Sequence, residues 1–197
     1  PKPPIQIRPA IPSDLPSLTT IVPRAFHPRN AYIKKCHPDT PAVRAWWWKI
    51  FAEEIAEPDC YVLVAAIENR KEQQNQNQKD SPLLPCGFWT KYPLTPDQNS
   101  TLFQPAITAM SQARALAFSP SPSKPTPNQA APQPHFLLEL LGISHDYQNL
   151  QLARRLLTLA GEISDKAGWE TFVEANANAV GLYRKMGFEE VGKVEIP

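Results

Sequence analysis

Glycine and cysteine are scarce in this sequence. Only 7 of the 197 residues are glycine, against 23 prolines, and neither a GxGxxG nor a Walker phosphate loop occurs. No two of the three cysteines are spaced as CxxC, and the histidines lack the spacing of metal ligands, so neither a metal site nor a disulfide framework is expected. Idle thiols are the simpler interpretation of Cys36, Cys60 and Cys86.

The sequence also lacks an excess of charge of one sign and any long hydrophobic run. Lys and Arg total 20 against 19 for Asp and Glu, without a basic block, so we expect no nucleic-acid partner. No run approaches the roughly 20 apolar residues that a bilayer requires, and the first ten residues resemble no signal peptide. We expect a soluble single domain over residues 1–197 with no membrane contact, in the cytoplasm or alternatively the nucleus.

The first third of the chain predicts two helices between two strands. Residues 5–8 form an extended stretch, and a helix capped by Ser13 is bent or ended near Pro23. A second helix begins at the Thr40-Pro41 pair and runs to about Glu57. Its three consecutive tryptophans, residues 46–48, point in different directions, which favours core packing over a ligand platform. The apolar run 60–67 is typical of a strand covered on both faces.

The middle of the chain predicts loops with little regular structure. Residues 69–82 are almost entirely polar and are expected to form a flexible connection to a third strand, residues 86–92. Residues 93–134 are rich in proline, with one helical stripe between Ala106 and Ala117. A lid over a substrate and an incidental surface helix are both open interpretations of this stripe.

The last third alternates strands and helices. A buried strand over 136–143 precedes a helix from Ala153 to Ala167, which is closed by Gly168. A strand over 169–174, a helix capped by Asn176 or Asn178 and ending near Lys185, and a final strand over 188–196 follow. Strands separated by helices are the signature of a parallel pair, so the fold class is α/β.

The segment NANAVGLYRKMGF, residues 176–188, resembles the second cofactor motif of the GNAT superfamily of N-acetyltransferases, NxxAxxLYxKxGF, at every fixed position. The order of elements before it is also similar to that family over nearly the whole chain, and the IRPA and AFHP segments resemble its fungal branch. The resemblance implies a mixed central sheet with a splayed parallel strand pair and flanking helices. It also implies acetyl-CoA as the cosubstrate.

The first cofactor motif departs from the family pattern Q/R-x-x-G-x-G/A. Gln148 and Ala153 fit, but Gln151 replaces the first glycine. The motif works because the first N–H groups of a helix receive a pyrophosphate, and glycine allows a close approach. A Gln151 side chain either crowds the phosphates or swings outward, and Arg154 either adds a charge-assisted bond or is solvated. The resemblance assigns cofactor contacts to Leu141, Gly142, Ile143, Gln148, Asn149, Leu150, Gln151, Leu152, Ala153, Arg154, Asn176 and Tyr183.

Three residues are expected to carry the chemistry. Glu139 is a lone carboxylate among leucines, alternating with Leu137, Leu141 and Ile143, and the family often places a general base there; a structural salt bridge is the alternative. The Ile143 N–H is expected to polarise the thioester carbonyl. The resemblance assigns Tyr183 the protonation of the CoA thiolate, although it is alternatively only a packing residue.

The resulting hypothesis is direct transfer of an acetyl group from acetyl-CoA to a primary amine of a small molecule or peptide, by a monomer or homodimer. The alternative is a non-catalytic acyl-CoA-binding or protein-interaction module. His145 is a reserve base, and Asn176 is alternatively only a helix cap. Residues 26–39 and 93–134 are expected to shape the acceptor pocket. The start at Pro1 and the stop at Pro197 predict a trimmed or incomplete product, with the last strand open to another chain.

Overall fold

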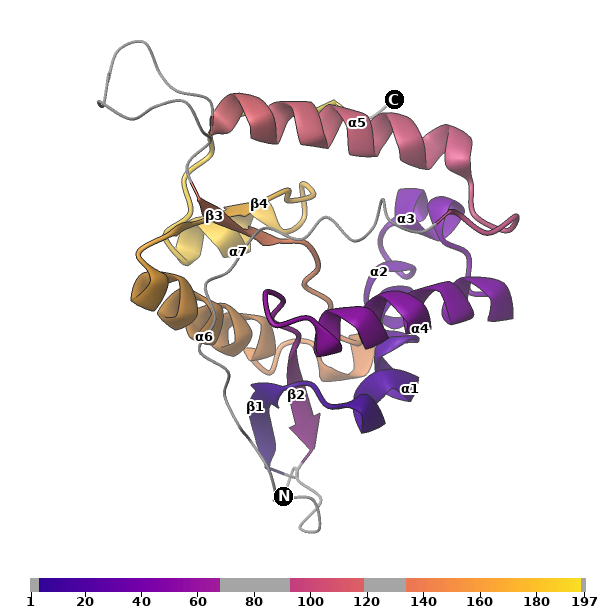
Figure 1. Cartoon of the computed structure of the whole chain (residues 1–197), viewed down its shortest axis with the longest axis horizontal. Helices are drawn as coiled ribbons and strands as arrows, with labels where there is room; N and C mark the ends of the chain where they lie inside the picture. The colour runs from indigo at the N-terminus through magenta and orange to yellow at the C-terminus, as the bar shows by residue number, and fades with distance from the viewer. Residues whose placement is uncertain (1–3, 68–92, 119–133, 196–197) are drawn as a thin grey trace.

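The computed structural model describes residues 4–67, 93–118 and 134–195, and both helices and strands recur along these ranges (Figure 1). In chain order the elements are β1 (Ile5–Pro9), the 3-10 helix η1 (Pro12–Asp14), α1 (Leu15–Leu18), α2 (Ile21–Phe26), α3 (Ala31–Cys36), α4 (Pro41–Ala56), β2 (Leu63–Ile67), α5 (Ser100–Ala117), β3 (His135–Leu138), the 3-10 helix η3 (His145–Tyr147), α6 (Leu152–Ala167), β4 (Glu170–Val173) and α7 (Val180–Lys185).

The strands of the described residues form two small sheets. β1 and β2 are antiparallel, with Ile5 opposite Ile67, while β3 and β4 are parallel, with His135 opposite Glu170. The predicted α/β class and parallel pair are therefore observed. A single mixed sheet is not seen within these residues, and the predicted strand over 86–92 lies outside them.

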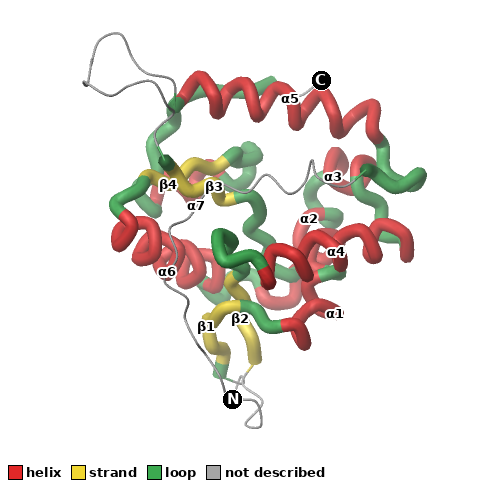
Figure 2. The backbone as a smooth tube through the Cα atoms, in the orientation of Figure 1, coloured by secondary structure: helices red, strands yellow, loops and turns green. Residues whose placement is uncertain are grey.

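Helices cover both faces of the parallel pair. α6 contacts both β2 and β4, so it bridges the two sheets. α5 lies over the opposite face, where the Phe118 ring stacks on His135 at a centroid distance of 3.6 Å and meets Phe172 edge-on. Figure 2 shows this order, with β3 and β4 between α5 and α6.

The main hydrophobic core gathers around α4. Thr40 caps this helix by accepting a hydrogen bond from the Val43 N–H at 3.3 Å, and proline occupies the first helical position. Trp46 and Trp47 are buried there, as the core interpretation predicted, but Trp48 is 44% exposed. Consecutive helical residues point about 100° apart, so one of the three tryptophans faces solvent.

The N-terminal helical region differs from the one helix, bent or ended near Pro23, that the sequence predicts. α1 ends at Leu18, and α2 begins only at Ile21. Pro23 is the third residue of α2, where a helix needs no N–H donor, so the proline does not break it. α3 was not predicted; the Asn30 side chain caps it by accepting from the Ile33 N–H at 2.9 Å.

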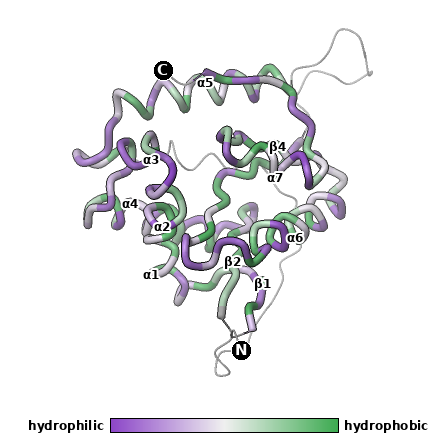
Figure 3. The backbone as a smooth tube through the Cα atoms, turned by 180° about the vertical axis from the view of Figure 1, so that it is seen from behind, coloured by the Kyte–Doolittle hydropathy of each residue, from purple (hydrophilic) through white to green (hydrophobic). Residues whose placement is uncertain are grey.

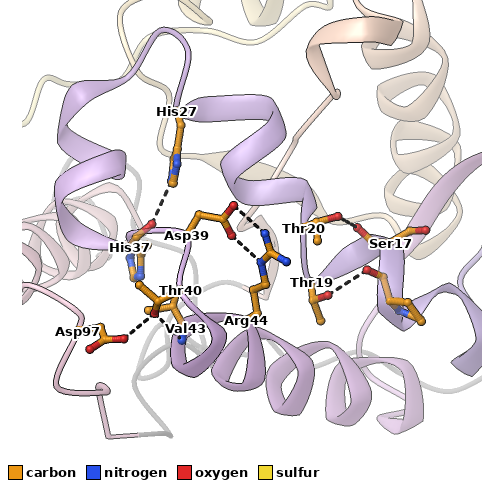
Figure 4. A network of polar contacts seen from close by, with 11 residues as sticks. Ser17, Thr19, Thr20, His27, His37, Asp39, Thr40, Val43, Arg44 and Asp97 are labelled. Atoms are coloured by element: carbon orange, nitrogen blue, oxygen red, sulfur yellow. Dashed lines mark hydrogen bonds and ion pairs between the residues drawn. The ribbon is translucent and has the colours of Figure 1, made fainter.

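A polar network ties α2, α3 and α4 to the segment before α5 (Figure 4). The His27 ring contacts the His37 carbonyl at 3.0 Å, and the Thr40 hydroxyl donates to Asp97 at 2.6 Å. Arg44 binds the Asp39 carboxylate through two nitrogens, and these hydrogen bonds hold the pKa of Asp39 below its usual range. These contacts fix the three helices to one another.

α5 is longer than the predicted helix, and the predicted stripe is confirmed only in its N-terminal part. It begins at Ser100, capped by the Asn99 side chain, and it contains Pro105. Phe103 and Ala106 are buried, whereas Leu116 is 76% exposed, so the predicted stripe is wrong at its C-terminal end. The helix is anchored at its first turn, where the Tyr32 hydroxyl donates to the Leu102 carbonyl at 2.8 Å, and at its end by Phe118.

The C-terminal third confirms the predicted order of β3, α6, β4 and α7, with two corrections. Gly168 closes α6 in the left-handed conformation at φ 67°, as predicted. β3, however, ends at Leu138 rather than Ile143, and residues 188–195 do not form the expected final strand. In the part of the chain described here, no helix combines the length and hydrophobicity needed to traverse a membrane.

Candidate active site

The main chain leaves the parallel pair just after β3. Pairing ends at Leu138 and Val173, and the mostly hydrophobic residues 140–143 then continue outside any strand (Figure 3). Within the described ranges, the N–H groups of Leu141, Gly142 and Ile143 donate no hydrogen bond. This segment therefore offers half-buried main-chain donors to an extended ligand, as an open strand edge does.

Gly142 lies tightly against α2. A Cβ atom on this glycine would come within 3.2 Å of Ala25 Cβ and 3.3 Å of Phe26 Cε2. The absence of a side chain therefore permits the close approach of the 140–143 segment to α2. Although the sequence predicted a pocket contribution from residues 26–39, the structure also places the end of α2 beside the candidate cofactor segment.

The turn into α6 is held by one motif residue. The Gln148 side chain donates through Nε2 to the Ile143 carbonyl at 3.2 Å, which joins the turn to the segment after β3. The next residues include two non-glycine left-handed positions, Asn149 at φ 63° and Gln151 at φ 58°. Glycine adopts this conformation without steric cost, which explains why the family pattern has glycine at the position of Gln151.

The first N–H groups of α6 remain available as hydrogen-bond donors. Gln151 is the exposed N-cap residue, and its side chain forms no capping hydrogen bond. The first main-chain bond of the helix runs from the Arg155 N–H to the Gln151 carbonyl at 3.0 Å. Among the described residues, the N–H groups of residues 152–154 consequently have no partner, and they lie at the positive end of the helix dipole. The residues present therefore fit an anionic diphosphate.

The two arginines of this turn differ. Arg154 is exposed beside the open helix end. Arg155 is already used by the fold, because its Nη2 donates to the Ile5 carbonyl at 2.9 Å and ties α6 to β1.

Tyr183 is the buried residue of α7. The residue is 7% exposed, and its ring meets Phe188 edge-on at 5.4 Å, while its hydroxyl has no hydrogen-bond partner within the described part of the chain. Burial raises the pKa of Tyr183 to about 12. The phenol is therefore protonated at neutral pH, as a proton donor must be.

Neither Asn176 nor Asn178 caps α7, whose N-cap residue is Ala179, so the predicted capping role is wrong; Asn176 instead holds the turn that precedes the helix. Its Oδ1 accepts a hydrogen bond from the Ala179 N–H at 3.1 Å. The side chain is exposed, and its amide NH2 is directed to no partner among the described residues, so it retains donors for a ligand.

Glu139 is half-buried and directly follows β3. Since regular alternation stops at Leu138, the predicted common face with Leu141 and Ile143 is not supported by strand geometry. His145 is exposed in η3, 4.0 Å from the Asp146 carboxylate, which is the geometry of a loop histidine.

Sequence reasoning missed Glu174, which follows β4. Its Oε1 is buried without a hydrogen bond, and Arg114 Nη2 of α5 lies 3.6 Å away. Burial raises the pKa of Glu174, and the Arg114 charge opposes this change. The signal was present in the sequence, because both strands of the parallel pair are followed by glutamate.

Other chemistry finds less support in the described residues. No group of three His, Cys, Asp or Glu side chains there is arranged to hold a metal ion. Cys36 is a buried thiol, and Cys86 lies outside the described ranges.

Comparison with protein-family models matches residues 130–196 to the acetyltransferase (GNAT) domain. The matched range contains β3, α6, β4 and α7, together with every residue discussed above from Glu139 to Tyr183. A search of curated proteins finds no match to the chain.

Proposed function

Because residues 130–196 match the acetyltransferase (GNAT) domain, we propose that the protein moves an acetyl group from acetyl-CoA to a primary amine by direct attack. The observation that carries this proposal is the pair of unused main-chain donor groups, at 141–143 and at the start of α6. They lie on either side of a turn that Gln148 fixes.

The first donor group suits the pantetheine arm, which would add to residues 141–143 as an extra strand. The second suits the diphosphate, because three N–H groups and the helix dipole converge at residues 152–154. Leu150 belongs to this turn by position, while Arg154 and the Asn176 amide are available to further oxygens. Gln151 is compatible with diphosphate binding here, because its exposed side chain accepts no hydrogen bond from the N–H groups of residues 152–154.

In the proposed reaction, Glu139 takes a proton from the substrate ammonium, and the amine nitrogen then attacks the thioester carbon. The Ile143 N–H stabilises the oxygen charge that develops in the transition state. As the C–S bond breaks, Tyr183 gives its proton to the departing thiolate, and the new amide releases its second proton to restore the phenol. The raised pKa of Tyr183 keeps the donor protonated before this step.

We extend the proposal to one domain over residues 1–197, acting in the cytoplasm as a monomer or homodimer on a small-molecule or peptide amine. The fungal character and whole-chain extent of the resemblance stay predictions. α2, beside Gly142, and α5, over the parallel pair, are the described elements best placed to contact the acceptor.

Two measurements test the proposal. Acetyl-CoA is expected to raise the thermal unfolding temperature, and free CoA is expected to appear faster when a panel of primary amines is added. Binding without amine-dependent release would favour the non-catalytic acyl-CoA-binding module instead. An absence of any shift or release would contradict both functions.

A further inference from the structure

Two glutamates follow the parallel pair at the same level. The register places Leu138 of β3 opposite Val173 of β4, and the residues that follow these two are Glu139 and Glu174. Both glutamates therefore leave the parallel pair at the same end, where the carboxyl ends of β3 and β4 lie side by side. The ion pair of Glu174 with Arg114 of α5 puts Glu174 on the side of the pair that α5 covers.

α5 places one positively charged side chain, Arg114, beside Glu174. Arg114 Nη2 is 3.6 Å from the buried Glu174 Oε1, which is an ion-pair distance but too long for a hydrogen bond. A structural Arg–carboxylate pair normally closes to about 2.7–2.9 Å. Arg114 therefore holds the carboxylate electrostatically while leaving the hydrogen-bonding capacity of Oε1 unused.

A buried carboxylate oxygen that accepts no hydrogen bond is costly, and native structures contain few of them. Burial also raises the pKa of Glu174, because the loss of solvation disfavours the charged carboxylate more than the charge of Arg114 stabilises it. Functional sites are where such costs are maintained, because the missing partner arrives with the substrate. An ammonium group supplies three N–H donors and a positive charge, so it matches what Oε1 lacks.

We infer that Glu174 binds the cationic amine of the acceptor and positions it beside Glu139, under α5. This inference rests on the proposed acetyl transfer and names its acceptor class, a primary amine that is protonated at neutral pH. One N–H donates to Glu174 while another gives its proton to Glu139. The remaining hydrogen bond to Glu174 then orients the nitrogen lone pair during attack.

The kinetic test compares Glu174→Gln with Glu174→Asp and with the matched control Glu170→Gln, at an exposed glutamate that begins the same strand. Acetyl-CoA is supplied with tyramine, 1,5-diaminopentane or glycinamide. Glu174→Gln is expected to raise the KM for the amine about tenfold or more, the usual loss for a hydrogen bond to a charged group, with the KM for acetyl-CoA within about twofold. Glu174→Asp should retain part of the amine affinity, and Glu170→Gln should match the wild type.

An unchanged amine KM in Glu174→Gln, with an active wild type, overturns this inference and leaves the proposed function standing. A wild type that acetylates none of the three amines overturns the transfer reaction and the inference together. The two failures are therefore distinguishable from the wild-type rate alone.

Thermal unfolding at pH 7.5 without substrates supplies a second readout. Glu174→Gln removes a buried charge whose pKa is raised, so its unfolding temperature should equal or exceed that of the wild type. A marked fall in Glu174→Gln, absent from Glu170→Gln, would show that the Arg114 pair is a structural salt bridge and would overturn the inference.

Discussion

Replacing Gln151 with glycine is expected to stabilise the protein. Gln151 stands at φ 58°, in the left-handed region, and its exposed side chain makes no capping bond that would be lost. For a residue with a Cβ this conformation costs roughly 1–2 kcal/mol. Glycine avoids that cost but loses about 0.5–1 kcal/mol more conformational entropy on folding. The net expectation is about 1 kcal/mol of added stability, or about 2–4 °C in the unfolding temperature of a chain this long.

Urea unfolding followed by tryptophan fluorescence measures this change, with Gln151→Ala as the matched control. Alanine also loses the glutamine side chain but keeps the Cβ, so it should give no comparable gain. Asn149→Gly should gain less than Gln151→Gly, because asparagine tolerates the left-handed region better. Equal effects of glycine and alanine at position 151, or a loss of stability with glycine, would refute the assignment of backbone strain to this turn.

Three other changes probe the reaction and the core. Tyr183→Phe should lower kcat about 100-fold, the usual contribution of a general acid, while the acetyl-CoA thermal shift stays the same. Glu139→Gln should flatten the acidic limb of the pH–rate profile, because the group that must lose its proton is gone. Burial lowers the pKa of His37 to about 4, with a further contribution from His27. The folded state therefore resists protonation of His37, and stability should fall as the pH drops from about 6.5 towards 4; urea midpoints across this range should fall less in His37→Gln.

Each of these three has its own contrary result. An unchanged kcat in Tyr183→Phe would leave that residue as packing for Phe188. A preserved acidic limb in Glu139→Gln would show that another residue is the base. Glu139→Asp is the control, because it keeps a carboxylate at this position. The same acid sensitivity in His37→Gln and the wild type would assign it to other groups.

The elements that sequence reasoning located well are those whose signals are local. α4 has a Thr-Pro start and a dense apolar stripe, and α6 ends at a glycine that the left-handed cap requires. The parallel pair followed from strand length and the intervening helix. These features depend on neighbours in sequence, so periodicity and capping chemistry suffice.

The features that sequence reasoning missed depend on contacts across the chain. The early start of α5 follows from packing of its first turn on α3, through Tyr32 and the Asn99 N–H that reaches the Cys36 carbonyl at 3.1 Å. β3 ends at Leu138, where its pairing with β4 stops, and an apolar run in the sequence does not indicate where pairing stops. Glu174 could be placed in the site only once the fold brought Arg114 of α5 to within 3.6 Å of its carboxylate.

The contact between Gly142 and α2 has a kinetic consequence. In the proposed function, the main chain that receives the thioester touches α2, the helix proposed to contact the acceptor, and a methyl group on Gly142 would come within 3.2 Å of Ala25 Cβ. If the acceptor displaces α2 when it binds, residues 140–143, which are proposed to bind acetyl-CoA, must move with the helix. Such coupling favours substrate synergism, in which either ligand alters the affinity for its companion by the same factor.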